Sequence, residues 1–224
     1  MENLIQTLAT HVLPVIFAIT LHEAAHGYAA RHFGDPTAWQ LGRISANPLR
    51  HIDPVGTILV PALILLFSGG GFIFGWAKPV PVDFGRLRNP KRDMLWVAAA
   101  GPAANLAMLA GWILLAKFGF LYPDSMYAEA AQAMGRAGIM INASLMLLNL
   151  LPLPPLDGGR IMVSLLPNRL AWRFAQIEPY GFIILLVLMF THVLNAILLP
   201  LLLVLLSLLS WVFNLNLVSL VFNF

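Results

Sequence analysis

Long apolar stretches alternate along the chain with short connections rich in polar residues, Pro and Gly, and this pattern predicts helices that cross a membrane. About 20 consecutive apolar residues cross a bilayer as a helix, and three stretches approach or exceed this length: 4–31, 94–118 and 138–151. The tail after Gly181 contains no Asp, Glu, Lys or Arg, so it predicts about two further apolar helices, divided near Asn195 or Pro200. We therefore expect an all-α polytopic membrane protein with a core of three transmembrane helices, forming a single domain over residues 1–224.

The connections are expected to be irregular. Residues 37–54 contain Asn-Pro and Asp-Pro dipeptides and predict short strands and turns, whereas residues 119–137 predict a near-neutral loop. Residues 55–75 are apolar but interrupted by Pro61 and by Gly69–Gly71. This segment is long enough to cross, but its backbone favours a re-entrant element buried in protein.

Basic residues predict on which side of the membrane the connections lie. Lys and Arg gather in three of them: 31–54, 76–93 and 160–173. The positive-inside rule places all three in the cytoplasm. Because the first two flank residues 55–75 from the same side, this charge pattern also favours re-entry of that segment.

Composition agrees with a membrane protein and excludes several other classes. Hydrophobic residues make up 59% of the 224 residues and charged residues 10%, whereas roughly a quarter of the residues in soluble domains are charged. The net charge of +3 is explained by the basic connections, so nucleic-acid binding is not expected. There is no Cys, which leaves His, Asp and Glu as the metal-binding side chains.

The segment HEAAH places three titratable side chains in the apolar first helix. His22 and His26 are four residues apart, so their rings project from one face and can bind the same metal ion. Glu23 lies about 100° around the helix, within reach of a water on that metal. Zinc lowers the pKa of its water towards 7, and a carboxylate can take the proton. The segment therefore predicts a zinc site with Glu23 as the general base.

A third protein ligand is expected, because catalytic zinc usually has three such ligands and one open position. Asp157 is the only acidic residue between Glu129 and Glu178, and it follows a Pro-rich break at which an unwound helix could point a carboxylate inward. Alone, Asp157 could equally cap a helix before Gly158; beside two histidines that need a ligand, metal binding is favoured. His51 is an alternative ligand, although its loop setting is more typical of a hydrogen-bonding histidine.

These features together resemble the site-2 protease family of intramembrane zinc metalloproteases, in a short form without PDZ or CBS domains. The resemblance covers nearly the whole chain and rests on three motifs: HEAAH (22–26), GPAAN (101–105) and NLLPLPPLDGG (149–159). It implies zinc on His22, His26 and Asp157, with Glu23 as the general base. It also implies that a membrane partner, or prior cutting of the substrate, regulates the activity.

The resemblance extends to two asparagines and one connection. Asn149 opens the family pattern associated with holding an extended substrate, and Asn105 ends the Gly-Pro motif, so both are expected as substrate-binding or packing residues. The alternative is that they hydrogen-bond between helices. Residues 75–82 resemble the family's re-entrant β-element, in which an extended edge could pair with an unwound substrate. Pro79 and Pro81 would leave only one edge free to pair, and a simple connecting loop is the alternative.

The leading hypothesis is a zinc endopeptidase that cuts transmembrane segments of membrane proteins. We expect it in a prokaryotic inner membrane, with its site near the cytoplasmic face and with the bilayer, a transmembrane substrate and a regulatory membrane protein as partners. A non-hydrolytic zinc transporter is one alternative, but its polar residues would follow a whole path rather than cluster near one end. An inactive relative that binds helices is another, but zinc binding alone would not require Glu23.

Overall fold

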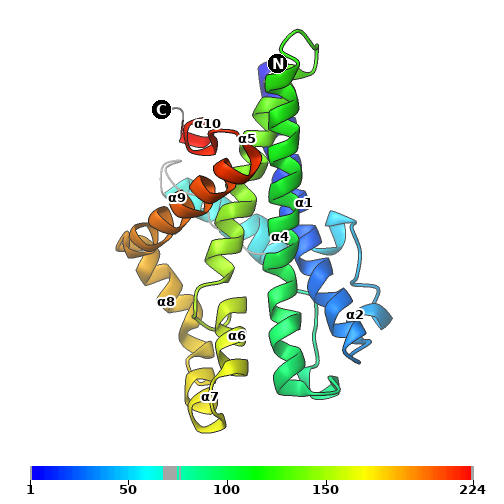
Figure 1. The fold of residues 1–224 in the computed structure, drawn as a ribbon. Coiled ribbons are helices and arrows are strands. Elements are labelled where there is room, and N and C mark those ends of the chain that lie inside the picture. Colours follow the sequence, from blue (N-terminus) through cyan, green and yellow to red (C-terminus); the bar gives the residue numbers. More distant parts are fainter. Residues whose placement is uncertain (1, 68–74, 76, 223–224) are drawn as a thin grey trace.

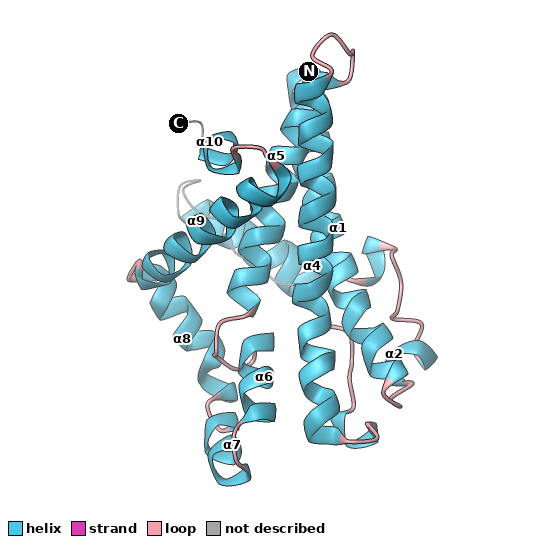
Figure 2. Cartoon of the chain, in the orientation of Figure 1, coloured by secondary structure: helices cyan, strands magenta, loops and turns pink. Residues whose placement is uncertain are grey.

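A computed structural model of the chain describes residues 2–67, 75 and 77–222, and each regular element in these residues is a helix (Figure 2). Three long helices form the centre of the molecule (Figure 1): α1 (Glu2–His32), α4 (Pro90–Leu121) and α5 (Ala128–Asn149). α4 packs against both of the others, and α1 also contacts α5. The expected core of three long helices is therefore present, although among the described residues only α4 of the three is long and apolar enough to be a candidate membrane span.

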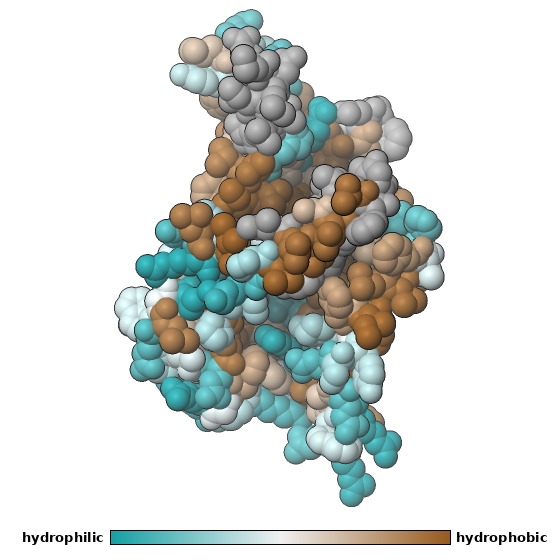
Figure 3. Space-filling view, turned by 180° about the vertical axis from the view of Figure 1, so that it is seen from behind, coloured by the Kyte–Doolittle hydropathy of each residue, from teal (hydrophilic) through white to brown (hydrophobic). Residues whose placement is uncertain are grey.

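The shorter elements gather at one end of this core. The lower end in Figure 1 carries α2 (Thr37–Gln40), α6 (Asp157–Leu165) and α7 (Asn168–Ala175), whereas the N-terminus and the α4–α5 connection lie at the upper end. Seen from behind, hydrophilic residues cover most of the lower part of the molecule and hydrophobic residues form a band above it (Figure 3). The three basic connections thus share one end, as the positive-inside rule predicts.

Two helices in the described part are long and apolar enough to cross a membrane, namely α4 and α9 (Val193–Phe213). A third span is formed if α7 and α8 (Glu178–Phe190), which meet at an angle of 61°, count as one bent segment. α5 is not among these candidates; its first half carries Gln132 and Arg136. Length and composition therefore give two to three candidate spans within the described residues.

The upper half of the molecule contains the main hydrophobic core. Leu109 and Ile113 of α4 meet Ile139 of α5, and α9 and α10 (Leu217–Phe222) close over them with Leu206 and Leu217. These side chains are almost fully buried. The tail is thus anchored on the upper half of the α4–α5 pair.

Several predicted boundaries are wrong, for identifiable reasons. α5 begins at Ala128, so much of the expected 119–137 loop is helical; its Ala-rich start favours helix although it lacks an apolar stripe. The tail divides at His192, which adopts a left-handed conformation and lies close to the expected break near Asn195, whereas the alternative break at Pro200 is wrong because Pro200 lies inside α9. Residues 37–54 contain α2 and a 3₁₀ turn, η1 (Pro48–Arg50), instead of the expected strands.

The apolar segment after this region contains a π-helical turn, η2 (Pro54–Leu59), and α3 (Val60–Phe67). Together they reach about 20 Å, at about 1.5 Å per residue, which is less than the roughly 30 Å of a hydrocarbon core. These 14 residues alone do not decide between crossing and re-entry, so re-entry of residues 55–75 stays a prediction. Gly69–Gly71 lie outside the described residues.

Residues 77–83 form an extended connection, here called the strap, and the expected β-element is not found in the described residues of 75–82. Pro79 and Pro81 have no amide hydrogen to give to a neighbouring strand. The amide of Val80, which lies between them, donates instead to Oε2 of Glu23 at 2.7 Å. The strap therefore lies against α1 and is bonded to a side chain rather than to another strand.

Asp35 fixes the far end of the strap to the turn that follows α1. Its carboxylate is fully buried and accepts hydrogen bonds from the Asp83 amide at 2.7 Å and from both the amide and the hydroxyl of Thr37. Burial alone would raise the pKa of Asp35, but these bonds and the nearby Arg86 outweigh burial and lower it. The carboxylate is thus charged at neutral pH and holds the strap in place.

Candidate metal centre

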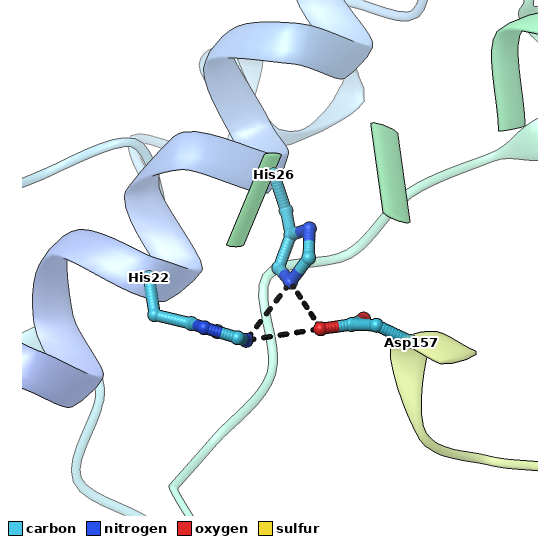
Figure 4. A group of neighbouring side chains, drawn as sticks. All are labelled: His22, His26 and Asp157. Carbon is cyan, nitrogen blue, oxygen red and sulfur yellow. Dashed lines mark hydrogen bonds and ion pairs between the residues drawn. The ribbon is translucent and has the colours of Figure 1, made fainter. Parts of the chain in front are cut away.

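Three predicted site residues meet at the lower half of the helical core. His22 and His26 project from the same face of α1, and Asp157 is the first residue of α6 (Figure 4). The two Nε2 atoms are 3.1 Å apart, and Oδ2 of Asp157 lies 3.2 Å from His22 and 3.3 Å from His26. All three side chains are buried. The structure thus brings together residues that are more than 130 positions apart in the chain.

Hydrogen bonds on the far side of each imidazole determine its tautomer. Nδ1 of His26 donates to the carbonyl of Val97 at 2.7 Å. Nδ1 of His22 lies 2.5 Å from Oδ1 of Asn105, whose amide nitrogen is already used as a donor. A neutral imidazole that donates from Nδ1 presents a lone pair at Nε2. Both Nε2 atoms are therefore acceptors that face each other and a carboxylate oxygen.

These three ligand atoms, two imidazole nitrogens and one carboxylate oxygen, fit a zinc ion. In the described structure, Oδ2 of Asp157 has no hydrogen-bond donor, so three buried acceptors converge without a proton to share. Ligands about 2.0 to 2.2 Å from a tetrahedral zinc lie roughly 3.3 to 3.6 Å from one another, slightly more than the observed separations. Two imidazoles and one carboxylate also leave a fourth position open, as in catalytic zinc sites.

A glycine of α4 makes room for the two rings. A Cβ atom on Gly101 would overlap the imidazoles of both His22 and His26. α4 can therefore approach α1 closely only at a residue without a side chain. One turn later the same helix presents Asn105, so the GPAAN motif supplies both the space for the histidines and a hydrogen-bond partner for one of them.

Glycines also position Asp157. A Cβ on Gly158 would overlap the carbonyls of Leu150 and Leu151, and one on Gly159 would overlap the backbone at Pro154. The start of α6 therefore packs directly on the Pro-rich connection before it. Leu156 occupies the N-cap position of α6 and Asp157 is its first residue, so Asp157 is not the N-cap that the helix-capping alternative required.

Asn105 lies behind His22 rather than at an exposed surface. Its side chain is fully buried and donates to the carbonyl of Ala18 at 3.3 Å and to Oδ1 of Asn142 at 3.0 Å. Asn142, equally buried, donates onward to the carbonyl of Gly138. Sequence reasoning missed Asn142; the available signal was a lone amide in the apolar run of α5. This series of hydrogen bonds links α1, α4 and α5 behind the metal centre.

Replacing Asn142 by Leu is expected to weaken zinc binding about 10- to 100-fold, the usual cost of losing an outer hydrogen-bond partner of a metal ligand. The substitution removes the acceptor that orients Asn105, which in turn orients His22. Zinc affinity can be measured by competition with a chromophoric chelator. Asn149→Leu is the matched control on the same helix, because within the described residues its amide donates to the carbonyl of Leu145 in α5 and not to the metal centre. Equal affinities of the two variants would contradict the role of Asn142.

Glu23 and the remaining candidates lie outside the three-residue cluster. Glu23 is half-buried on the adjacent face of α1, where the strap amide occupies Oε2. Asn149 is the last residue of α5, just before the Pro-rich connection, and its role in substrate binding stays a prediction. His51 is buried in a loop with Nε2 at 2.9 Å from the carbonyl of Ser45, the setting expected of a hydrogen-bonding histidine.

Comparison with known proteins points to one family. Residues 106–192 match the model of peptidase family M50. The chain is 39% identical over 201 residues to "Putative zinc metalloprotease YwhC" of Bacillus subtilis, covering 85% of this chain and 84% of that protein. It is 30% identical to the similarly named Rip2 of Mycolicibacterium smegmatis and of Mycobacterium tuberculosis, covering 80% of this chain but 66% of each relative. No solved structure matches the chain.

Proposed function

The chain belongs to peptidase family M50, the site-2 proteases, and we propose that it cuts membrane-protein substrates within or beside a transmembrane segment. Membership makes it a zinc metalloprotease of a membrane. The observation that supports the finer proposal is the position of the buried His22, His26 and Asp157 cluster on the helices of the core. A buried site among such helices suits a substrate that is itself in the membrane.

In the proposed mechanism, the residues of the chain bind the metal, transfer a proton and limit the access of water. His22, His26 and Asp157 hold the metal, and Glu23 takes a proton from the attacking water and delivers it to the leaving amine. Zinc, when bound, supplies Lewis acidity and lowers the pKa of a coordinated water towards 7. The buried side chains around the cluster limit access of bulk water, which strengthens the electrostatic interactions within the site.

We place the site near the cytoplasmic face. The cluster lies in the part of the core nearest to α2, α6 and α7, the end that carries the basic connections (Figure 1). The positive-inside rule assigns that end to the cytoplasm. A substrate helix must unwind before cleavage, because the hydrogen bonds of a helix shield its peptide bonds. We therefore expect substrates with a weak helix near the cytoplasmic boundary.

Purified protein in proteoliposomes is expected to cut a reporter whose transmembrane segment contains Gly and Asn near its cytoplasmic end, and to spare a matched all-Leu segment. The reason is the lower cost of unwinding the first segment. Mass spectrometry of the products maps the cut. Cleavage confined to soluble loops, equal in both reporters, would contradict the proposal. Zinc flux without cleavage would favour the transporter instead.

A further inference from the structure

A basic pocket lies beside the strap, outside the metal centre. It has a volume of about 550 Å³, and its walls come from the end of α2, the η1 region and the start of the strap. Three of its lining residues are cationic, namely Arg43, Arg50 and Lys78, and none is acidic. Among the described residues none of these three cations forms a salt bridge. Three uncompensated positive charges thus share one pocket.

Backbone carbonyls accept hydrogen bonds from two of these cations, Arg43 and Arg50. Other N–H groups of the two guanidinium groups are not used in these bonds. Nη2 of Arg43 donates to the carbonyls of Lys78 and Pro79, at 3.0 and 3.3 Å. Nη1 of Arg50 donates to the carbonyl of Gly42. Nε of Arg43 is buried and has no acceptor in the described structure. Guanidinium groups fixed in this way are suited to an anion such as phosphate, which accepts several hydrogen bonds at once.

Apolar side chains line the pocket beside the cations, and more of them follow in the next segment of the chain. Leu41 is 63% exposed and Leu49 72% exposed, and both line the pocket. Two residues beyond the lining residue Ile52 the chain enters η2 and α3, which expose further large apolar side chains: Val55, Leu59, Leu63 and Leu66. A headgroup bound by the cations would thus have its acyl chains beside an apolar surface, the arrangement of a lipid at a membrane boundary.

We propose that this pocket binds the phosphate headgroup of an anionic phospholipid. A lipid here also supports the strap, because Arg43 bridges the pocket and the carbonyls of Lys78 and Pro79. The next residue is Val80, whose amide bonds to Glu23. Anionic lipid at the pocket therefore stabilises the conformation in which the strap lies across the face of α1 that carries Glu23.

Native mass spectrometry of the full-length protein, supplied with phosphatidylglycerol or phosphatidylcholine of matched acyl chains, tests this site. We expect wild-type protein to prefer phosphatidylglycerol by about tenfold or more, which corresponds to about 1.4 kcal/mol, because basic residues attract anionic headgroups. The double variant Arg50→Gln/Lys78→Gln is expected to lose that preference and to keep its zinc content. Arg43 is left intact because it also holds the strap.

The matched control is Arg169→Gln/Arg173→Gln, which removes two positive charges from α7 at the same end of the molecule. This control is expected to retain the preference for phosphatidylglycerol. An equal loss of the preference for phosphatidylglycerol in both double variants would overturn the proposal. The preference would then come from the overall positive charge of this end of the molecule. Equal binding of the two lipids by wild-type protein would overturn the proposal as well. Displacement of the lipid by equimolar inorganic phosphate would also overturn it, because the ligand would then be a free anion.

Discussion

Purified wild-type protein is expected to contain about one zinc ion per chain, and Asp157→Ala and His22→Ala are each expected to lose most of it. Each substitution leaves two ligands where a catalytic zinc site needs three. The loss should exceed the roughly 10- to 100-fold that outer-shell substitutions cost. Metal content can be measured by inductively coupled plasma mass spectrometry after dialysis against a weak chelator.

His51→Ala provides the control for this experiment. His51 is as buried as the ligands, but it bonds to a loop carbonyl and lies outside the cluster. We expect this variant to keep its zinc. Full zinc content in Asp157→Ala would contradict the assignment of Asp157, and loss of zinc from His51→Ala in a folded protein would point to a different ligand set. Circular dichroism of each variant separates loss of metal from loss of fold.

The two histidines of the metal cluster were predictable from local helix geometry, whereas Asp157 was predicted from its isolation among acidic residues and from the family resemblance. His22 and His26 share a helix face through their four-residue spacing, and Asp157 is the only acidic residue in a long interval that follows a helix break. The structure brings all three together. The fold class was predictable for a similar reason, since long apolar stretches of this kind have few alternatives to a helix in a membrane.

The parts that were not predictable depend on contacts between distant segments. Asn142 is an ordinary amide in α5 until its helix packs against Asn105, 37 residues away in sequence. Gly101 matters because of where α4 crosses α1, and no local pattern specifies that crossing. Residues 75–82 were expected to form a re-entrant β-element, with a simple loop as the alternative; in the described residues they form a loop whose Val80 amide donates to the carboxylate of Glu23. Each of these features is tertiary, and each surrounds the metal cluster.

Replacing Glu23 by Gln is expected to abolish cleavage of a transmembrane reporter while leaving zinc content unchanged. A general base contributes typically about 10²- to 10⁴-fold to a rate, and an amide cannot take the proton. Gln keeps the size of the side chain and an oxygen that can accept the Val80 amide, so the strap should stay in place. Cleavage and zinc content are measured on the same preparation.

A second substitution at the same position separates the two roles of Glu23. Glu23→Ala removes both the base and the acceptor for Val80, so the strap loses its bond to α1 as well. We expect no cleavage from either variant, but faster hydrogen exchange at Val80 only in Glu23→Ala. Cleavage by Glu23→Gln close to the wild-type rate would show that another group takes the proton. Because zinc binding does not need this carboxylate, loss of activity with retained zinc assigns Glu23 to the chemistry rather than to the metal.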